Sequence, residues 1–85
     1  MITKQVVAEK IAAWLRHETS QAELVSWAED VMRDADFPAA DAAELARVVG
    51  RLGLADVKEF GLAWEDCEEL LKSLGFTAKV EITAA

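Results

Sequence analysis

The sequence predicts a mainly α protein, a small bundle of four to five helices with a short C-terminal β-strand extension. Three observations lead to this class. Apolar side chains recur at helical spacing through the first three quarters of the 85 residues, capping residues precede several of these stripes, and the period changes to two in the tail. With 53% hydrophobic side chains and one proline, residues 1–85 are expected to form a single helical domain.

The first two helices are predicted from their apolar stripes and their N-terminal caps. The first is expected over residues 3–17, with Thr3 available as its cap. Its stripe consists of Val7, Ile11, Trp14 and Leu15. The second is expected over residues 21–34, because Ser20 and Glu23 have the spacing of a capping box, in which each side chain accepts from a backbone N–H of the other residue.

The middle of the chain predicts a third helix and a short fourth one. Asp41 and Glu44 have the capping-box spacing and precede the third helix, which is expected over residues 41–52. Gly53 stands where a left-handed C-terminal cap is expected. A two-turn helix over residues 54–60 should follow. Its apolar edge would consist of Leu54, Val57 and Phe60.

The last helix and the tail have different periods. The helix is expected over residues 64–74, with carboxylates in its first turn and Gly75 as its stop. Side chains alternate over residues 77–83, with Val80 and Ile82 on the apolar face, which predicts a half-buried strand. Such a strand could pair with the N-terminal segment, with the tail of a second copy or with the edge of another protein, or it could be disordered.

The acidic charge is concentrated in one region. The net charge is −7, and residues 21–46 hold one basic and seven acidic side chains, a net charge of −6. This balance argues against nucleic-acid binding, which depends on cations. Two acidic surfaces are predicted, one from Glu23, Glu29, Asp30, Asp34 and Asp36, the other from Glu65, Asp66, Glu68 and Glu69. They can serve solubility alone, or they can dock a basic protein.

The three tryptophans receive different interpretations. Trp14 and Trp27 lie in apolar helical stripes and are expected in the core. Trp64 begins a helix beside two carboxylates and is expected to be half exposed, as an aromatic anchor of an interface would be.

The sequence predicts no catalytic group, cofactor or metal site. Cys67 lies on an apolar helix face, as a structural thiol does, and His17 fits a helix C-terminus. Two Cys and His residues in total are too few for a structural zinc site. The aspartates Asp34, Asp36 and Asp41 lack the glycine and the final glutamate of a calcium loop. The glycines near residue 50 lack the spacing of a phosphate-binding loop.

The cysteine count bears on the compartment. A single cysteine cannot form an intramolecular disulfide, which favours a reducing, cytoplasmic location. Charged residues interrupt every apolar run near the N-terminus, so neither a signal peptide nor a membrane span is expected.

The segment from residue 52 to residue 75 carries a resemblance. It reads LGLADVKEFGLAWEDCEELLKSLG and resembles small uncharacterised bacterial acidic helical proteins with an LGxxDVxxFGLxWEDCExxLxxLG segment. The resemblance implies no activity. The polar cap usual before the tryptophan is Ala63 in this chain. As a small acidic helical protein, the chain is also similar to bacterial immunity proteins that neutralise basic toxins.

Together these features favour a non-catalytic protein-interaction module, which would associate with itself through the tail or an apolar helix face. The alternative is an acidic immunity or inhibitor-type protein that neutralises a basic partner. An enzyme using a carboxylate or Cys67 is the least favoured class, and no small-molecule substrate is predicted.

Overall fold

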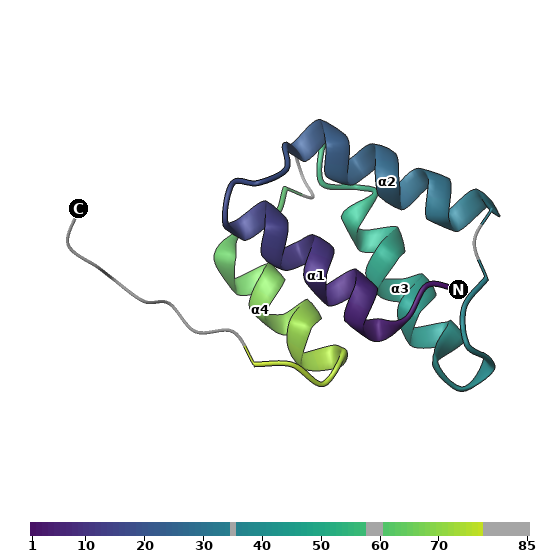
Figure 1. Ribbon diagram of the computed structural model, residues 1–85. Coiled ribbons are helices and arrows are strands. Elements are labelled where there is room, and N and C mark those ends of the chain that lie inside the picture. Colours follow the sequence, from purple (N-terminus) through teal and green to yellow (C-terminus); the bar gives the residue numbers. More distant parts are fainter. Residues whose placement is uncertain (35, 58–60, 78–85) are drawn as a thin grey trace.

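The structure is a computed structural model that describes residues 1–34, 36–57 and 61–77, and these residues are mainly helical (Figure 1). The helices are α1 (Lys4–Leu15), α2 (Gln21–Asp34), α3 (Ala42–Leu52) and α4 (Trp64–Ser73), with a 3-10 turn, η1 (Ala39–Asp41), directly before α3. The mainly α class is confirmed. The predicted strand over residues 77–83 is not supported: Thr77 is not in a strand, and the rest of that segment, with Val80 and Ile82, lies outside the described residues.

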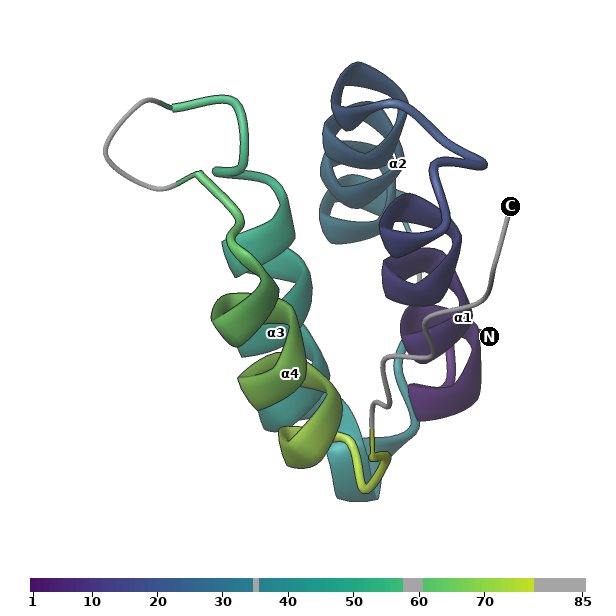
Figure 2. The same ribbon diagram turned by 90° about the vertical axis from the view of Figure 1, so that its left-hand side faces the viewer.

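The helices pack around one apolar core, and the most extensive contact is between α2 and α3. In the view of Figure 2, α3 and α4 lie on the left, and α1 and α2 lie on the right. Helix α1 contacts each of the other three helices, and α2 packs along α3. The core cluster consists of Val7, Ala8, Ile11, Leu24, Ala28, Val31, Leu45, Val48, Val49, Leu52, Cys67, Leu70, Leu71 and Leu74. Trp14 and Trp27 pack against this cluster while their side chains stay partly exposed.

Helix α1 begins as predicted and ends earlier than predicted. The Thr3 side chain accepts a hydrogen bond from the Val6 N–H at 3.3 Å. The helix ends at Leu15 because His17 adopts a left-handed conformation, with φ of +62°. The His17 N–H then donates to the carbonyl of Trp14, and the Glu18 N–H donates to the carbonyl of Ala13. Together these two hydrogen bonds form a Schellman motif.

Helix α2 confirms its capping box. The Ser20 N–H donates to the Glu23 carboxylate at 3.0 Å, and the Glu23 N–H donates to the Ser20 hydroxyl at 3.1 Å. The predicted box before α3 is wrong. The Asp41 side chain makes no capping hydrogen bond, and its Oδ1 lies 3.3 Å from Lys4 Nζ. The turn η1 leads directly into the helix in place of such a cap.

The segment after α3 also differs from the prediction. Gly53 has φ of −66°, so it is not a left-handed cap. Over residues 54–57 the chain forms successive turns in place of the predicted helix over residues 54–60, and residues 58–60 lie outside the described residues. Of the expected apolar edge, Leu54 and Val57 are exposed. The buried residue is Ala55, whose carbonyl accepts a hydrogen bond from the Gln21 side chain at the start of α2.

Helix α4 has one strong terminus and one weaker one. At its start, Ala63 has the extended conformation of a cap but no side-chain oxygen, and its N–H donates to the Asp66 carboxylate at 2.9 Å. Asp66 thus supplies half of a capping box. At its end, Gly75 has φ of +89° and closes a second Schellman motif, in which the Phe76 N–H donates to the Leu71 carbonyl.

Among the described residues, each helix falls short of the length and apolar character that crossing a bilayer requires.

Candidate functional site

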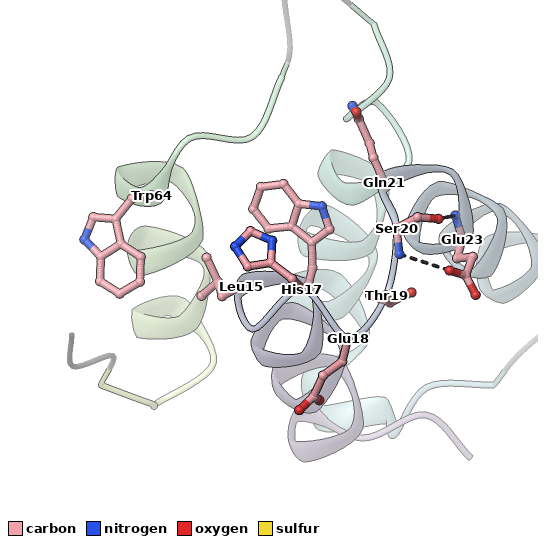
Figure 3. Close-up of a pocket in the computed structure, with 9 residues that line it drawn as sticks. Leu15, His17, Glu18, Thr19, Ser20, Gln21, Glu23 and Trp64 are labelled. Carbon is pink, nitrogen blue, oxygen red and sulfur yellow. Dashed lines mark hydrogen bonds between the residues drawn. The ribbon is translucent and has the colours of Figure 1, made fainter. Parts of the chain in front are cut away.

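The turn between α1 and α2 and the start of α4 enclose an open cavity of about 690 Å³, called here the corner cavity (Figure 3). It is lined by Trp14, Leu15, His17, Glu18, Thr19, Ser20, Gln21, Glu23 and Trp64. In the view of Figure 3 the lining runs from Trp64, past Leu15 and His17, to Ser20 and Glu23. In this view, the lining therefore has an aromatic side chain at one end and a carboxylate at the other.

Trp64 has an unusual position for a side chain of its size. It is the first residue of α4, it is partly exposed, and it is not one of the side chains that pack against the core of the described residues. Trp14 and Trp27 differ from it because both pack against that core. An indole that is held at a helix start, outside the core, is available to bury its surface against a partner.

The lining of the corner cavity is acidic. Among the described residues, its lining contains Glu18 and Glu23 and neither a lysine nor an arginine. Hydrogen bonds from the backbone and side chain of Ser20 lower the pKa of Glu23, so its carboxylate is charged at neutral pH. Aromatic faces together with carboxylates attract a cation on an apolar stem. The chain contains one such contact already, since Lys10 Nζ lies 5.5 Å from the centroid of the Trp27 ring.

His17 contributes to the cavity through its backbone conformation. The left-handed geometry turns the chain sharply between α1 and α2 and places the exposed His17 side chain in the cavity wall. Residues with a Cβ rarely adopt this geometry, and glycine is the usual occupant of this position in a Schellman motif.

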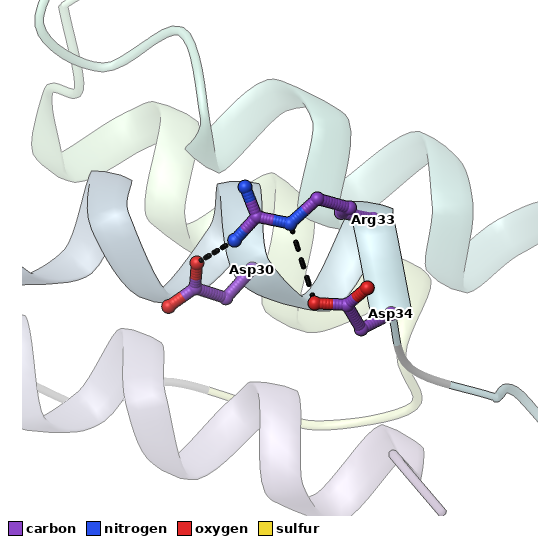
Figure 4. Close-up of polar contacts among 3 residues, drawn as sticks. All are labelled: Asp30, Arg33 and Asp34. Carbon is purple, nitrogen blue, oxygen red and sulfur yellow. Dashed lines mark hydrogen bonds and ion pairs between the residues drawn. The ribbon is translucent and has the colours of Figure 1, made fainter.

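The predicted acidic surface on α2 is partly neutralised by an arginine (Figure 4). Arg33 Nη2 lies 2.6 Å from Asp30 Oδ1, and Arg33 Nε lies 3.2 Å from Asp34 Oδ2. Glu29 and Asp36 are exposed and have no ion pair within the described part of the chain. The α2 surface is therefore less negative than the count of acidic residues indicates.

The four acidic residues of α4 have different environments. Asp66 caps the helix and lies 3.6 Å from Arg51 on α3. Glu65 and Glu69 are exposed, Glu68 is partly exposed, and none of the three has an ion pair among the described residues. These residues do not form one continuous docking face, because Asp66 and Glu69 border α3. The remaining predicted site residues, Val80 and Ile82, lie outside the described residues.

Cys67 lies in the core, which confirms the burial expected from its place on an apolar helix face. Burial, reinforced by the negative charge of Asp66, raises the pKa of the Cys67 thiol to about 11. At neutral pH it stays protonated and is a poor nucleophile. Across residues 1–34, 36–57 and 61–77, no three His, Cys, Asp or Glu side chains gather as a metal site would require.

The fold and the corner cavity define a small, mainly α protein with an open aromatic and acidic surface. The chain matches no protein-family model, and searches of curated proteins and of solved structures found no match. Functional roles are therefore inferred from the geometry of its own residues.

Sequence reasoning identified Trp64 but missed the cavity around it. The left-handed turn at His17 brings the end of α1 and the start of α2 beside Trp64, and this turn has no glycine to signal it. It also missed a groove between α3 and α4 at Gly50. Gly50 lies inside α3, and an isolated glycine within a helical pattern is the signal that could have indicated this surface.

Proposed function

We propose that this chain is a non-catalytic protein-interaction module whose corner cavity binds a basic segment of another protein. The observation that carries the proposal is the partly exposed Trp64, which stands outside the core and lines a cavity together with the carboxylates of Glu18 and Glu23. A lysine or arginine side chain fits this chemistry, because its stem can pack on an indole while its charge approaches a carboxylate.

The protonated, buried thiol of Cys67 supports the non-catalytic part of the proposal. Thiol catalysis requires a thiolate with access to substrate.

The test uses immobilised peptides of equal length and of positive, neutral or negative net charge, probed with the wild-type chain and with three variants. Wild type should prefer the basic peptides, and Trp64→Ala should weaken this binding about tenfold or more, as the loss of an interface anchor does. Glu18→Gln should weaken the binding and reduce its dependence on salt. Glu29→Gln is the matched control, since it removes one exposed carboxylate from α2 outside the cavity.

Two results would contradict the proposal. One is equal binding by wild type and Trp64→Ala. The other is an equal loss in Glu18→Gln and Glu29→Gln, which would mean that the peptides sense only the total charge of −7.

The alternative function, an acidic inhibitor of the immunity type, would use the same surface. It differs in its consequence, because the basic partner would be an active protein whose activity falls when it is bound. The two carboxylates in the described cavity lining, Glu18 and Glu23, are the observation that favours a basic partner in either case. Once a binding partner is known, an assay of its activity with wild type and with Trp64→Ala separates the two functions.

A further inference from the structure

A second surface, the α3–α4 groove, lies apart from the residues that line the corner cavity. Helices α3 and α4 run antiparallel (Figure 2), and residues of both helices line a cavity of about 580 Å³. It is lined by Ala46, Arg47, Gly50, Arg51, Leu54, Asp66, Glu69, Leu70 and Ser73.

The floor of the groove is apolar and open. A Cβ built on Gly50 would have no atom within 4 Å, and the Leu54 side chain, four residues further on, is 42% exposed. Alanine favours a helix more than glycine does, so nothing within the described fold requires a glycine at residue 50. A bare backbone at this position leaves room for a close approach from outside the chain.

The two rims of the groove carry opposite charges. Arg47 and Arg51 stand on α3, where Arg47 Nη2 also lies 2.5 Å from Glu44 Oε1, and Asp66 and Glu69 stand on α4. Two contacts give their order along the groove: Arg47 Nη2 lies 2.7 Å from Ser73 Oγ, and Arg51 Nη2 lies 3.6 Å from Asp66 Oδ2. Glu69 falls between these two levels and has no ion pair within the described residues.

This arrangement is complementary to itself. A two-fold axis that runs parallel to the groove sets α3 of each copy against α4 of the other. Rotation about this axis leaves the position of every residue along the groove unchanged. The basic rim of one copy then faces the acidic rim of the second, and Glu69 comes level with the arginines opposite. A like-charged pair of rims would repel, so the charge pattern selects this pairing over one that sets α3 against α3.

We propose that the α3–α4 groove is the interface of a homodimer, in which a second copy of this chain covers Gly50 and Leu54 and the rims pair Arg47 with Glu69 across the two-fold axis. The apolar floor supplies the buried area, and the rims determine the register. This interface uses neither Trp64 nor the tail.

The first experiment measures the mass of the full chain by sedimentation equilibrium over a range of concentrations. A monomer–dimer equilibrium is expected, and a monomer at every concentration would overturn the proposal. Glu69→Lys should raise the dissociation constant about tenfold or more, because each dimer contains two copies of the contact. Glu29→Lys changes the net charge equally on α2 and should leave the constant unchanged. An equal effect of the two substitutions would refute the pairing.

A charge swap tests the register directly. Arg47→Glu alone should weaken the dimer, and Arg47→Glu combined with Glu69→Lys should restore it to within about threefold of wild type. Failure of the double variant to recover would overturn the proposed pairing. Gly50→Gln should prevent association while the circular dichroism spectrum stays that of a folded chain, since the space around Gly50 is open.

Two further variants separate this proposal from the others. The double variant Val80→Asp/Ile82→Asp should still dimerise, and its loss of dimer would assign the interface to the tail and overturn the groove. Trp64→Ala should also remain dimeric, because Trp64 does not line the groove. A Trp64→Ala variant that dimerises but fails to bind basic peptides would support both surfaces as independent sites, whereas its loss of dimer would refute the groove.

Discussion

Replacing His17 with glycine should stabilise this protein by about 0.5–1 kcal/mol. His17 has φ of +62°, a conformation that costs a residue with a Cβ about 1–2 kcal/mol. Glycine adopts it freely, but glycine also loses more chain entropy on folding, by about 0.5–1 kcal/mol relative to alanine. The difference between these two terms gives the expected gain, which corresponds to a rise in Tm of about 2–8 °C for a domain of this size.

Two matched variants isolate the backbone contribution. His17→Ala removes the imidazole and keeps the left-handed strain, so the difference between His17→Gly and His17→Ala reports the backbone contribution alone, which is the strain relieved minus the extra chain entropy that glycine loses. Gly75 occupies the equivalent position in the Schellman motif of α4, with φ of +89° and no atom within 4 Å of a built Cβ. Gly75→Ala should therefore destabilise the protein by a similar amount, about 1 kcal/mol.

Urea unfolding followed by circular dichroism gives the free energy of unfolding for each variant. All variants must be compared at one protein concentration, because a dimer would make the apparent stability depend on concentration. Equal stability of His17→Gly and His17→Ala would refute the reasoning, since the strain relieved at the left-handed turn would then be no larger than the chain entropy that glycine loses. If His17→Gly were less stable than wild type, the reasoning would fail more strongly, because the imidazole side chain would then have to stabilise the turn.

The remaining predictions concern a cap, a carboxylate and the thiol. Ala63→Ser should stabilise the protein by about 0.5–1 kcal/mol, seen as a higher Tm, because the serine oxygen completes the capping box that Asp66 already half forms. The pKa of Glu23 is lowered from 4.5, so the contribution of its carboxylate to stability is complete above pH 4.5 and is lost as the pH falls through the lower folded-state pKa. Glu23→Gln should flatten this part of a stability–pH profile. An unchanged profile would show that the Glu23 carboxylate does not cause the pH dependence. Cys67 should react with a thiol reagent far more slowly in the native chain than in urea at mildly alkaline pH, and equal rates would contradict its burial.

The helices whose ends have local signals were predictable from the sequence. The box formed by Ser20 and Glu23 begins α2, and Gly75 ends α4, because each signal acts within a single turn of backbone. The prediction failed where a distant contact competes with the local signal. Asp41 has the spacing of a cap but pairs with Lys4 at the start of α1, a contact that only the tertiary fold creates.

The candidate site divides in the same way. Trp64 could be selected from its place at a helix start beside carboxylates, which is a local pattern. The wall opposite Trp64 could not, because it depends on the left-handed turn at His17, which brings two further elements to the same place. The charge count overstated the α2 surface for a related reason: Arg33 contacts both Asp30 and Asp34, and a net charge for a segment does not show which groups pair.

Helix α4 links the two proposed surfaces, since Trp64 lines the corner cavity and Glu69 lines the groove. Between them, the Asp66 carboxylate accepts the N–H of the cap residue and lies 3.6 Å from Arg51 on the opposite rim. A substitution at Asp66 would therefore disturb the helix start that holds the indole and the charge pattern of the groove at once. Loss of both activities in such a variant would not distinguish the two sites. Glu69 and Trp64, which have no partner in common among the described contacts, are the positions at which the two functions can be separated.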